Sequence, residues 1–192
     1  MTLSRPISRR LALGAGGLAL LAACQAPPRA LPEDGTIDLL SLLRDKPEHR
    51  RFLNALVTSG QAGRVGIRHG AVTLFVPTNE ALNGLPADFR AVLDNPPANP
   101  TDEQRQRAAA LVNANAAFGL LRLADIQPRN GQVQTWDRGR IQVNRTGDRT
   151  ATIVRQGVPP QPGAPTIAIT RADVLASDGV FHVTSSPILP GV

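Results

Sequence analysis

The chain of 192 residues has one cysteine, no tyrosine and one tryptophan, and aromatic residues make up 3% of it. A single cysteine excludes an internal disulfide framework. The basic residues are scattered and have few aromatic neighbours on which bases could stack, so we expect no nucleic-acid binding. His49 and His69 have no companion at the spacing of metal ligands. We therefore predict neither a metal site nor any other cofactor.

The N-terminal segment has the composition of an export signal. Arg5, Arg9 and Arg10 precede an uncharged run over residues 11–23, and the run ends on Cys24. It is shorter than the roughly 20 apolar residues that a helix needs to cross a bilayer. We therefore predict a removable signal peptide over residues 1–23 rather than a permanent transmembrane helix. Its removal takes three arginines with it and lowers the net charge from +6 to +3.

The end of this run, Leu21-Ala22-Ala23-Cys24, resembles the lipobox of bacterial lipoproteins. The resemblance implies that the thiol of Cys24 is acylated, with palmitate among the fatty acids, and that Cys24 becomes the new N-terminus. Two or more acyl chains give stable membrane anchoring. The alternative is that Cys24 is only a small apolar residue of the signal.

The route of export stays open between two pathways. Residues 8–13 around Arg9 and Arg10 resemble a twin-arginine signal, but Ala12 stands where an aromatic residue or leucine is usual. Gln25 follows the cysteine in place of aspartate, which is compatible with transfer to an outer membrane. We expect a protein that is lipid-anchored to the cell envelope, faces the periplasm or the cell surface, and lies on the outer rather than the inner membrane.

A short Pro-rich stretch connects this anchor to one domain. Residues 24–34 are predicted to be the lipidated cysteine and a stiff tether, and residues 35–192 the domain. The first half of the domain has helical patterns. Thr36 is expected to cap a first helix, Pro47 and Pro86 to open further helices, and Thr101 to form a capping box with Gln104.

Strand patterns dominate the second half. Residues 72–76 already read as a buried strand, and beyond residue 127 short strands alternate with turn signals at 137–139, 147–148 and 178–179. Residues 158–165 are too rich in proline for a central strand and are predicted to be a loop. Helices followed by antiparallel strands indicate an α+β domain.

Two segments about a hundred residues apart, TLFVPTNEAL at 73–82 and SDGVFHVTSSPILP at 177–190, resemble the two signature segments of the fasciclin (FAS1) domain. The resemblance implies a β-sheet wedge or sandwich on which several short helices pack, mainly from the N-terminal half. It also implies a non-catalytic role in adhesion. The residues that carry it are Thr73, Leu74, Phe75, Pro77, Thr78, Asn79, Asp178, Gly179, His182 and Pro190, and we interpret all of them as structural.

Physical reasons support this interpretation. Thr78 can cap a short helix after the first strand, and Asp178-Gly179 can turn the chain with positive φ. Asp178, His182, Ser185 and Ser186 look like a catalytic set, but a strand would space them too far apart for mutual hydrogen bonds. We expect His182 to be a partly buried strand histidine, and the chain not to be an enzyme.

Two further sites of the family differ in this chain. A Tyr-His pair, which in animal members of the extracellular matrix is linked to packing and integrin recognition, aligns with Ala114-Asn115. An Asp-Ile pair linked to integrin binding aligns with Asp173-Val174, which we interpret as a turn acid and a core aliphatic residue. Arginines near 137–140 and 144–149 are expected at hairpin turns, either as solvated charges or as a surface for an anionic partner.

The sequence thus predicts a membrane-tethered fasciclin-like domain that mediates adhesion or binds a protein or glycan of the envelope. The alternative is a periplasmic module that binds a small molecule or lipid in a cleft between helices and sheet.

Overall fold

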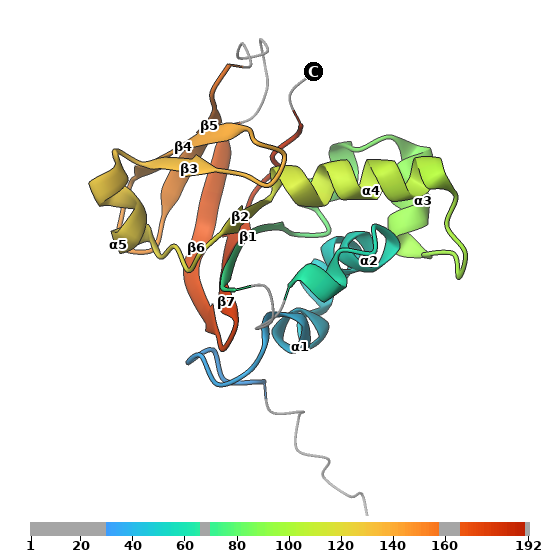
Figure 1. The fold of residues 1–192 in the computed structure, drawn as a ribbon, viewed down its shortest axis with the longest axis horizontal. Coiled ribbons are helices and arrows are strands. Elements are labelled where there is room, and N and C mark those ends of the chain that lie inside the picture. The colour runs from blue at the N-terminus through green and yellow to red at the C-terminus, as the bar shows by residue number, and fades with distance from the viewer. Residues whose placement is uncertain (1–29, 66–69, 158–165, 191–192) are drawn as a thin grey trace, which may run out of the picture.

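The computed structural model describes residues 30–65, 70–157 and 166–190. A layer of helices lies beside a strongly curved sheet, and one short helix lies at the opposite side of that sheet (Figure 1). This arrangement confirms the predicted α+β class with its helices mainly in the N-terminal half. The α-helices are α1 (Leu39–Arg44), α2 (Arg50–Thr58), α3 (Ala87–Asp94), α4 (Asp102–Ala114) and α5 (Leu123–Ile126), and short 3₁₀ turns cover Pro47–His49, Ala62–Arg64, Ala81–Gly84 and Gln127–Arg129.

Helix α4 begins as predicted. Thr101 Oγ1 accepts a hydrogen bond from Gln104 N–H at 3.2 Å, and Gln104 Oε1 accepts one from Thr101 N–H at 2.9 Å. The predicted cap of α1 was wrong, because Asp38 and not Thr36 is its N-cap and accepts from Ser41 N–H at 2.9 Å. The Thr36 hydroxyl instead donates a hydrogen bond to the Asp34 carboxylate at 2.6 Å.

The sheet has seven strands in the order β2-β1-β7-β6-β5-β4-β3. Strand β7 pairs in parallel with β1, and every other neighbouring pair is antiparallel. A bridge between Ala117 and Thr135 joins the two outer strands, so the sheet curls into a barrel-like form. The strands are β1 (Val72–Pro77), β2 (Ala116–Phe118), β3 (Gln132–Gln134), β4 (Arg140–Arg145), β5 (Ala151–Arg155), β6 (Ile167–Ala176) and β7 (Gly179–Thr184).

The alternation of side chains along β1 divides the core in two. Leu74 and Val76 face the helices and pack with Phe52 and Leu56 of α2, whereas Phe75 points into the interior of the curved sheet. All six residues of β1 are buried, as the apolar run predicted. Both faces of this strand are covered, which is why it lacks the polar alternation of an outer strand.

The start of the described chain is attached to the domain. Glu33 forms ion pairs with Lys46, at 2.6 Å, and with Arg171 of β6. Asp34 forms a parallel bridge with Leu175, and Leu31 N–H donates to the Asp45 carboxylate at 3.0 Å. The last residues of the predicted tether therefore lie against α1 and β6.

Several predictions fall on residues outside the described ranges. They include the signal peptide, Cys24, and the proline-rich loop at 158–165. Within the described ranges, no helix is long and apolar enough to cross a membrane.

Candidate functional site

The first signature segment joins β1 to its surroundings through side-chain hydrogen bonds. Thr73 Oγ1 donates to the Gly119 carbonyl at 2.7 Å and accepts from Leu121 N–H at 2.9 Å. Thr78 Oγ1 accepts from Ala81 N–H at 3.2 Å, but the helix predicted over residues 79–82 is a 3₁₀ turn over Ala81–Gly84 whose N-cap is Glu80. Each hydroxyl therefore satisfies backbone groups at the rim of the sheet.

Asn79 joins the first signature segment to the start of α2. Its Oδ1 accepts from Arg51 N–H at 3.0 Å, and its Nδ2 donates to the Pro47 carbonyl at 2.8 Å. The Arg51 guanidinium returns a hydrogen bond to the Asn79 carbonyl at 2.8 Å and forms a two-pronged ion pair with Asp94 of α3. That ion pair holds the pKa of Asp94 below its usual value. These contacts fix the Asn79 side chain between the first signature segment and the start of α2.

In the second signature segment, Asp178 and Gly179 connect three elements. Asp178 is buried, and its Oδ1 accepts from Leu39 N–H at the start of α1 at 2.8 Å. The predicted positive φ was wrong, because neither residue adopts it. Glycine is required at position 179 because there is no room for a side chain. A Cβ at this position would lie 2.0 Å from the Val72 carbonyl oxygen and 2.8 Å from Leu39 Cδ1.

His182 is completely buried, more deeply than the predicted partly buried strand histidine. Its ring stacks on Phe75 with centroids 5.5 Å apart. Nδ1 accepts from Asp173 N–H at 3.2 Å, so Nε2 carries the hydrogen and donates to the Leu121 carbonyl at 2.9 Å. Burial lowers the pKa of His182 against the opposing effects of that carbonyl and the Asp173 charge. The imidazole is neutral and both nitrogens are occupied.

The residues that resembled a catalytic set do not converge. The Asp178 carboxylate binds α1, and His182 bonds to Leu121 and Asp173. Ser185 Oγ accepts from Ala168 N–H at 2.9 Å, which places it against β6. Ser186 has no hydrogen bond to His182, and Pro190 is exposed at the end of the described chain. These hydrogen bonds connect the segment to α1, β6 and Leu121, and its purely structural role stays a prediction.

Asn115 stands at one of the two positions where the family's Tyr-His pair aligns, and it is fully buried. Its Nδ2 donates to the carbonyls of Leu111 and Ile188 at 2.7 and 2.8 Å, and its Oδ1 accepts from Ile188 N–H at 2.9 Å. The amide thus holds the C-terminal segment against the end of α4. It is a packing residue and is not displayed to a partner.

Asp173 was predicted to be a turn acid, and this was wrong. It lies within β6 at an irregularity of the pairing with β7 and has φ of 59°. Its Oδ1 accepts from Leu123 N–H at 3.0 Å, which fixes the start of α5. Val174 is buried in the core, as predicted.

The arginine-containing turns fall between β3 and β4 and between β4 and β5, as predicted. Asp137 is not a solvated charge, because it pairs with Arg155 at 2.6 Å and accepts from the Thr135 hydroxyl at 2.6 Å. Although burial acts to raise the pKa of Asp137, these hydrogen bonds hold it below its usual value. Arg138 and Arg140 are exposed.

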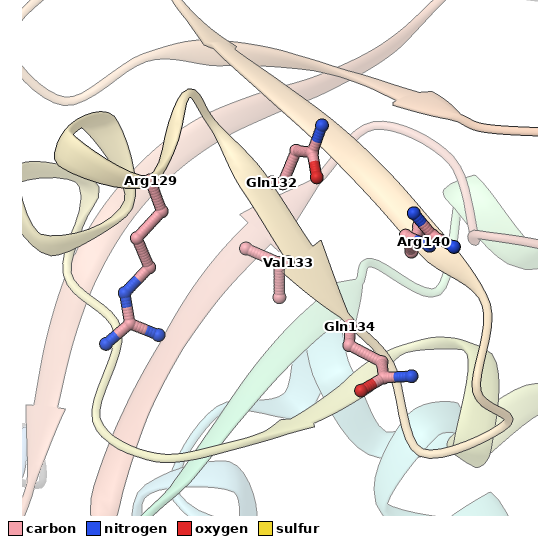
Figure 2. A pocket seen from close by; sticks show the side chains of 5 residues that line it. All are labelled: Arg129, Gln132, Val133, Gln134 and Arg140. Atoms are coloured by element: carbon pink, nitrogen blue, oxygen red, sulfur yellow. The ribbon is translucent and has the colours of Figure 1, made fainter.

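A hollow of about 430 Å³ lies beside β3 and is lined by Arg129, Gln132, Val133, Gln134 and Arg140 (Figure 2). Arg129 and Arg140 come from different elements and extend on different sides of β3. The lining is mainly polar, so this hollow does not match the predicted apolar cleft. No group of three or more His, Cys, Asp or Glu side chains that could hold a metal ion occurs in the described part of the chain.

Sequence reasoning missed a surface feature that combines distant segments. Phe118 of β2 is 61% exposed, and its ring lies 5.5 Å from that of Trp136, the residue after Thr135. The Arg64 guanidinium lies over Trp136 at 4.5 Å from the ring centroid. We call Arg64, Phe118 and Trp136 the aromatic patch. Only the scarcity of aromatics in the sequence could have drawn attention to these positions.

A short helical layer on a curved sheet, with its two signature segments paired as β1 and β7, defines an α+β domain of the fasciclin type. The family model "Fasciclin domain" matches residues 47–190, and the chain belongs to this family. Fasciclin domains occur in proteins of the cell-adhesion type and are generally not catalytic.

The same fold occurs in a solved FAS1 domain pair from the insect cell adhesion molecule fasciclin I. The TM-score is 0.62 at 16% sequence identity, and the match covers 81% of this chain. It covers 51% of the insect chain, so this chain spans about half the length of its structural relative. A search of curated proteins gives no significant match.

Proposed function

We propose that this chain is a membrane-tethered fasciclin domain of the cell envelope that binds another macromolecule and performs no catalysis. The observation that carries the proposal is membership of a family known in adhesion-type proteins, together with signature residues that serve the fold. The lipobox-like sequence before Cys24 supports anchoring in the envelope, with the outer membrane favoured.

The attached segment at Leu31–Asp34 sharpens this proposal. Because Leu31, Glu33 and Asp34 are bound to the domain, only the six residues 25–30 remain between Cys24 and Leu31, the first attached residue. An extended chain spans at most about 3.5 Å per residue, so this linker would reach about 20 Å. A lipid on Cys24 would keep the α1 and β6 side of the domain close to the membrane surface, and its partner would lie within the envelope.

The anchor is tested by Cys24→Ser followed by membrane fractionation. We expect the variant to be exported, folded and released from the membrane, with the thermal midpoint of the wild-type domain. A variant that remains in the membrane fraction would contradict the lipid anchor.

Partner binding is tested by amine-reactive cross-linking on intact envelopes. The control is an unrelated domain carried on the same anchor and tether, residues 1–30. The proposal predicts adducts with an envelope protein or glycan that the control does not form. Absence of adducts above this control would overturn the binding function.

A further inference from the structure

The aromatic patch contains Phe118, the one aromatic ring in the described structure that is mostly exposed, beside Trp136, which packs against the edge of the core. The chain has five phenylalanines and one tryptophan. Phe52, Phe75, Phe89 and Phe181 are buried, whereas Phe118 is 61% exposed and contacts the partly buried Trp136. A protein that buries its other aromatics gains nothing for folding by placing a phenylalanine on the surface. Exposed aromatics beside an arginine are instead the residues that contribute most energy in protein interfaces.

The polar groups of the patch lack partners. The indole Nε1–H of Trp136 is shielded from solvent and has no hydrogen-bond acceptor among the described residues, a state that costs about 1–3 kcal/mol. Arg64 is exposed and forms no ion pair with a described carboxylate. Its contact with the Trp136 ring orients the guanidinium at the edge of an apolar surface. The indole N–H is out of reach of a docking partner, whereas the exposed Arg64 guanidinium is a donor whose fork fits a carboxylate.

The arrangement of the rings selects among ligand classes. The Phe118 and Trp136 rings are tilted by 37° and Arg64 covers one face of Trp136, so the patch offers no flat platform for a sugar ring. Two rings and one cation also form a small area for insertion into lipid. A protein surface that presents an acidic side chain next to an apolar one would pair with the Arg64 charge and cover the exposed Phe118 ring at the same time.

We propose that the aromatic patch is the docking site for a protein partner that presents a carboxylate to Arg64 and an apolar side chain to Phe118. The site rests on the proposed binding function and assigns it to one surface. Leu120, two residues after Phe118, is a further exposed apolar residue in this part of the chain, with 38% of its surface accessible. The site joins residues from the 3₁₀ turn Ala62–Arg64, from β2 and from the β3–β4 turn, so it exists only in the folded domain.

The experiment places a benzophenone amino acid at position 118 of the full chain in intact cells. Position 154 is the matched control, because Val154 is also a strand residue and is 48% exposed. We expect a covalent adduct with a protein from position 118 and not from position 154. The cross-linked peptide of the partner should contain Asp or Glu, and Arg64→Glu should reduce the yield about tenfold. Exchange of that acid for lysine in the partner should restore the yield with Arg64→Glu.

A second measurement uses a synthetic peptide with the cross-linked partner sequence. Trp136 is the only tryptophan, so its fluorescence reports directly on the patch. We expect the peptide to change this emission, and Phe118→Ser, or conversion of the acidic residues of the peptide to amides, to weaken binding about tenfold. Val154→Ser should leave the affinity unchanged.

Other outcomes would overturn the assignment. These are adducts at position 118 that contain only glycan, lipid or a second copy of this chain, equal adducts from positions 118 and 154, and adducts that Arg64→Glu does not reduce. If amine-reactive cross-linking captures a partner while position 118 remains silent, the docking site is wrong and the binding function stands. If both remain silent, both proposals fail.

Discussion

The carboxylate of Asp178 accepts a hydrogen bond at 2.8 Å from the backbone N–H of Leu39, a residue 139 positions earlier in the chain. Leu39 opens α1, so its N–H has no partner within the helix. The turn before β7 therefore supplies a buried acceptor to a helix of the other layer. A signature residue of the family thus connects the sheet to the helices.

Asp178→Ala is expected to lower the free energy of unfolding by about 1–3 kcal/mol, because it leaves a buried N–H without an acceptor. Asp178→Asn retains a side-chain oxygen and should cost less than half as much. Urea denaturation of the two variants measures the difference. Asp148→Ala is the control, since Asp148 is fully exposed. Equal losses for the Asn and Ala variants would show that the hydrogen bond does not account for the effect.

Gly179→Ala is expected to destabilise the domain by about 3 kcal/mol or more, because the new methyl would overlap the Val72 carbonyl in the neighbouring strand. Gly84→Ala is the matched control, since no atom lies within 4 Å of a Cβ placed there. Thermal unfolding of both variants should separate them clearly. A Gly179→Ala domain as stable as the control would mean that β1 and β7 can move apart at no cost.

Asn115→Ala is expected to release the C-terminal segment from the end of α4. The substitution removes three hydrogen bonds in a fully buried site, two of which hold Ile188. We expect a loss of about 2–4 kcal/mol and faster amide exchange at Ile188. Amide exchange measured by NMR provides the check. Unchanged protection at Ile188 would contradict the role of Asn115 in holding this segment.

Stability is expected to fall as the pH drops below about 6.5, the ordinary pKa of histidine. Burial lowers the pKa values of His49 and His182, so below this pH the unfolded chain binds protons that the folded chain does not. The stabilisation is complete above the unfolded pKa and is lost as the pH falls toward the lower folded values, by at most about 1.4 kcal/mol per pH unit for each histidine.

Urea denaturation at pH 7.5, 6.5 and 5.5 measures this dependence. His182→Gln is the comparison, because it removes one of the titrating groups and should reduce the slope even though it lowers stability overall. A free energy of unfolding that is constant over this range would show that the buried histidines are not held neutral.

Local signals in the sequence predicted the local features of the fold. The run at 72–76 gave a buried strand, and Thr101 with Gln104 gave the start of α4, because a single short segment contains all the groups involved. The role of Gly179 could not be predicted in this way, since the atoms that forbid a side chain there belong to Val72 and Leu39. Asp173 was misjudged because its backbone conformation is imposed by contacts with Leu123 and His182.

The aromatic patch shows the same limit for a candidate site. Arg64, Phe118 and Trp136 belong to three separate parts of the chain, and no sequence motif contains more than one of them. Phe118 and Trp136 become neighbours because the outer strands β2 and β3 meet at the Ala117–Thr135 bridge, and Arg64 reaches Trp136 from the 3₁₀ turn Ala62–Arg64. The spacing of residues along the sequence does not show that β2 and β3 meet. The composition could indicate only that an aromatic residue on the surface would be unusual.

The attachment of Glu33 to Lys46 and Arg171 also has a mechanical consequence. Under the proposed anchoring and adhesion, tension transmitted from Cys24 would reach the domain first at Leu31–Asp34. Two ion pairs, one hydrogen bond and one bridge resist force less than the whole buried core does. They would yield first and lengthen the linker by several residues while β1, β7 and the helices remain intact. Release of this segment would then limit the force that reaches the folded domain and its bound partner.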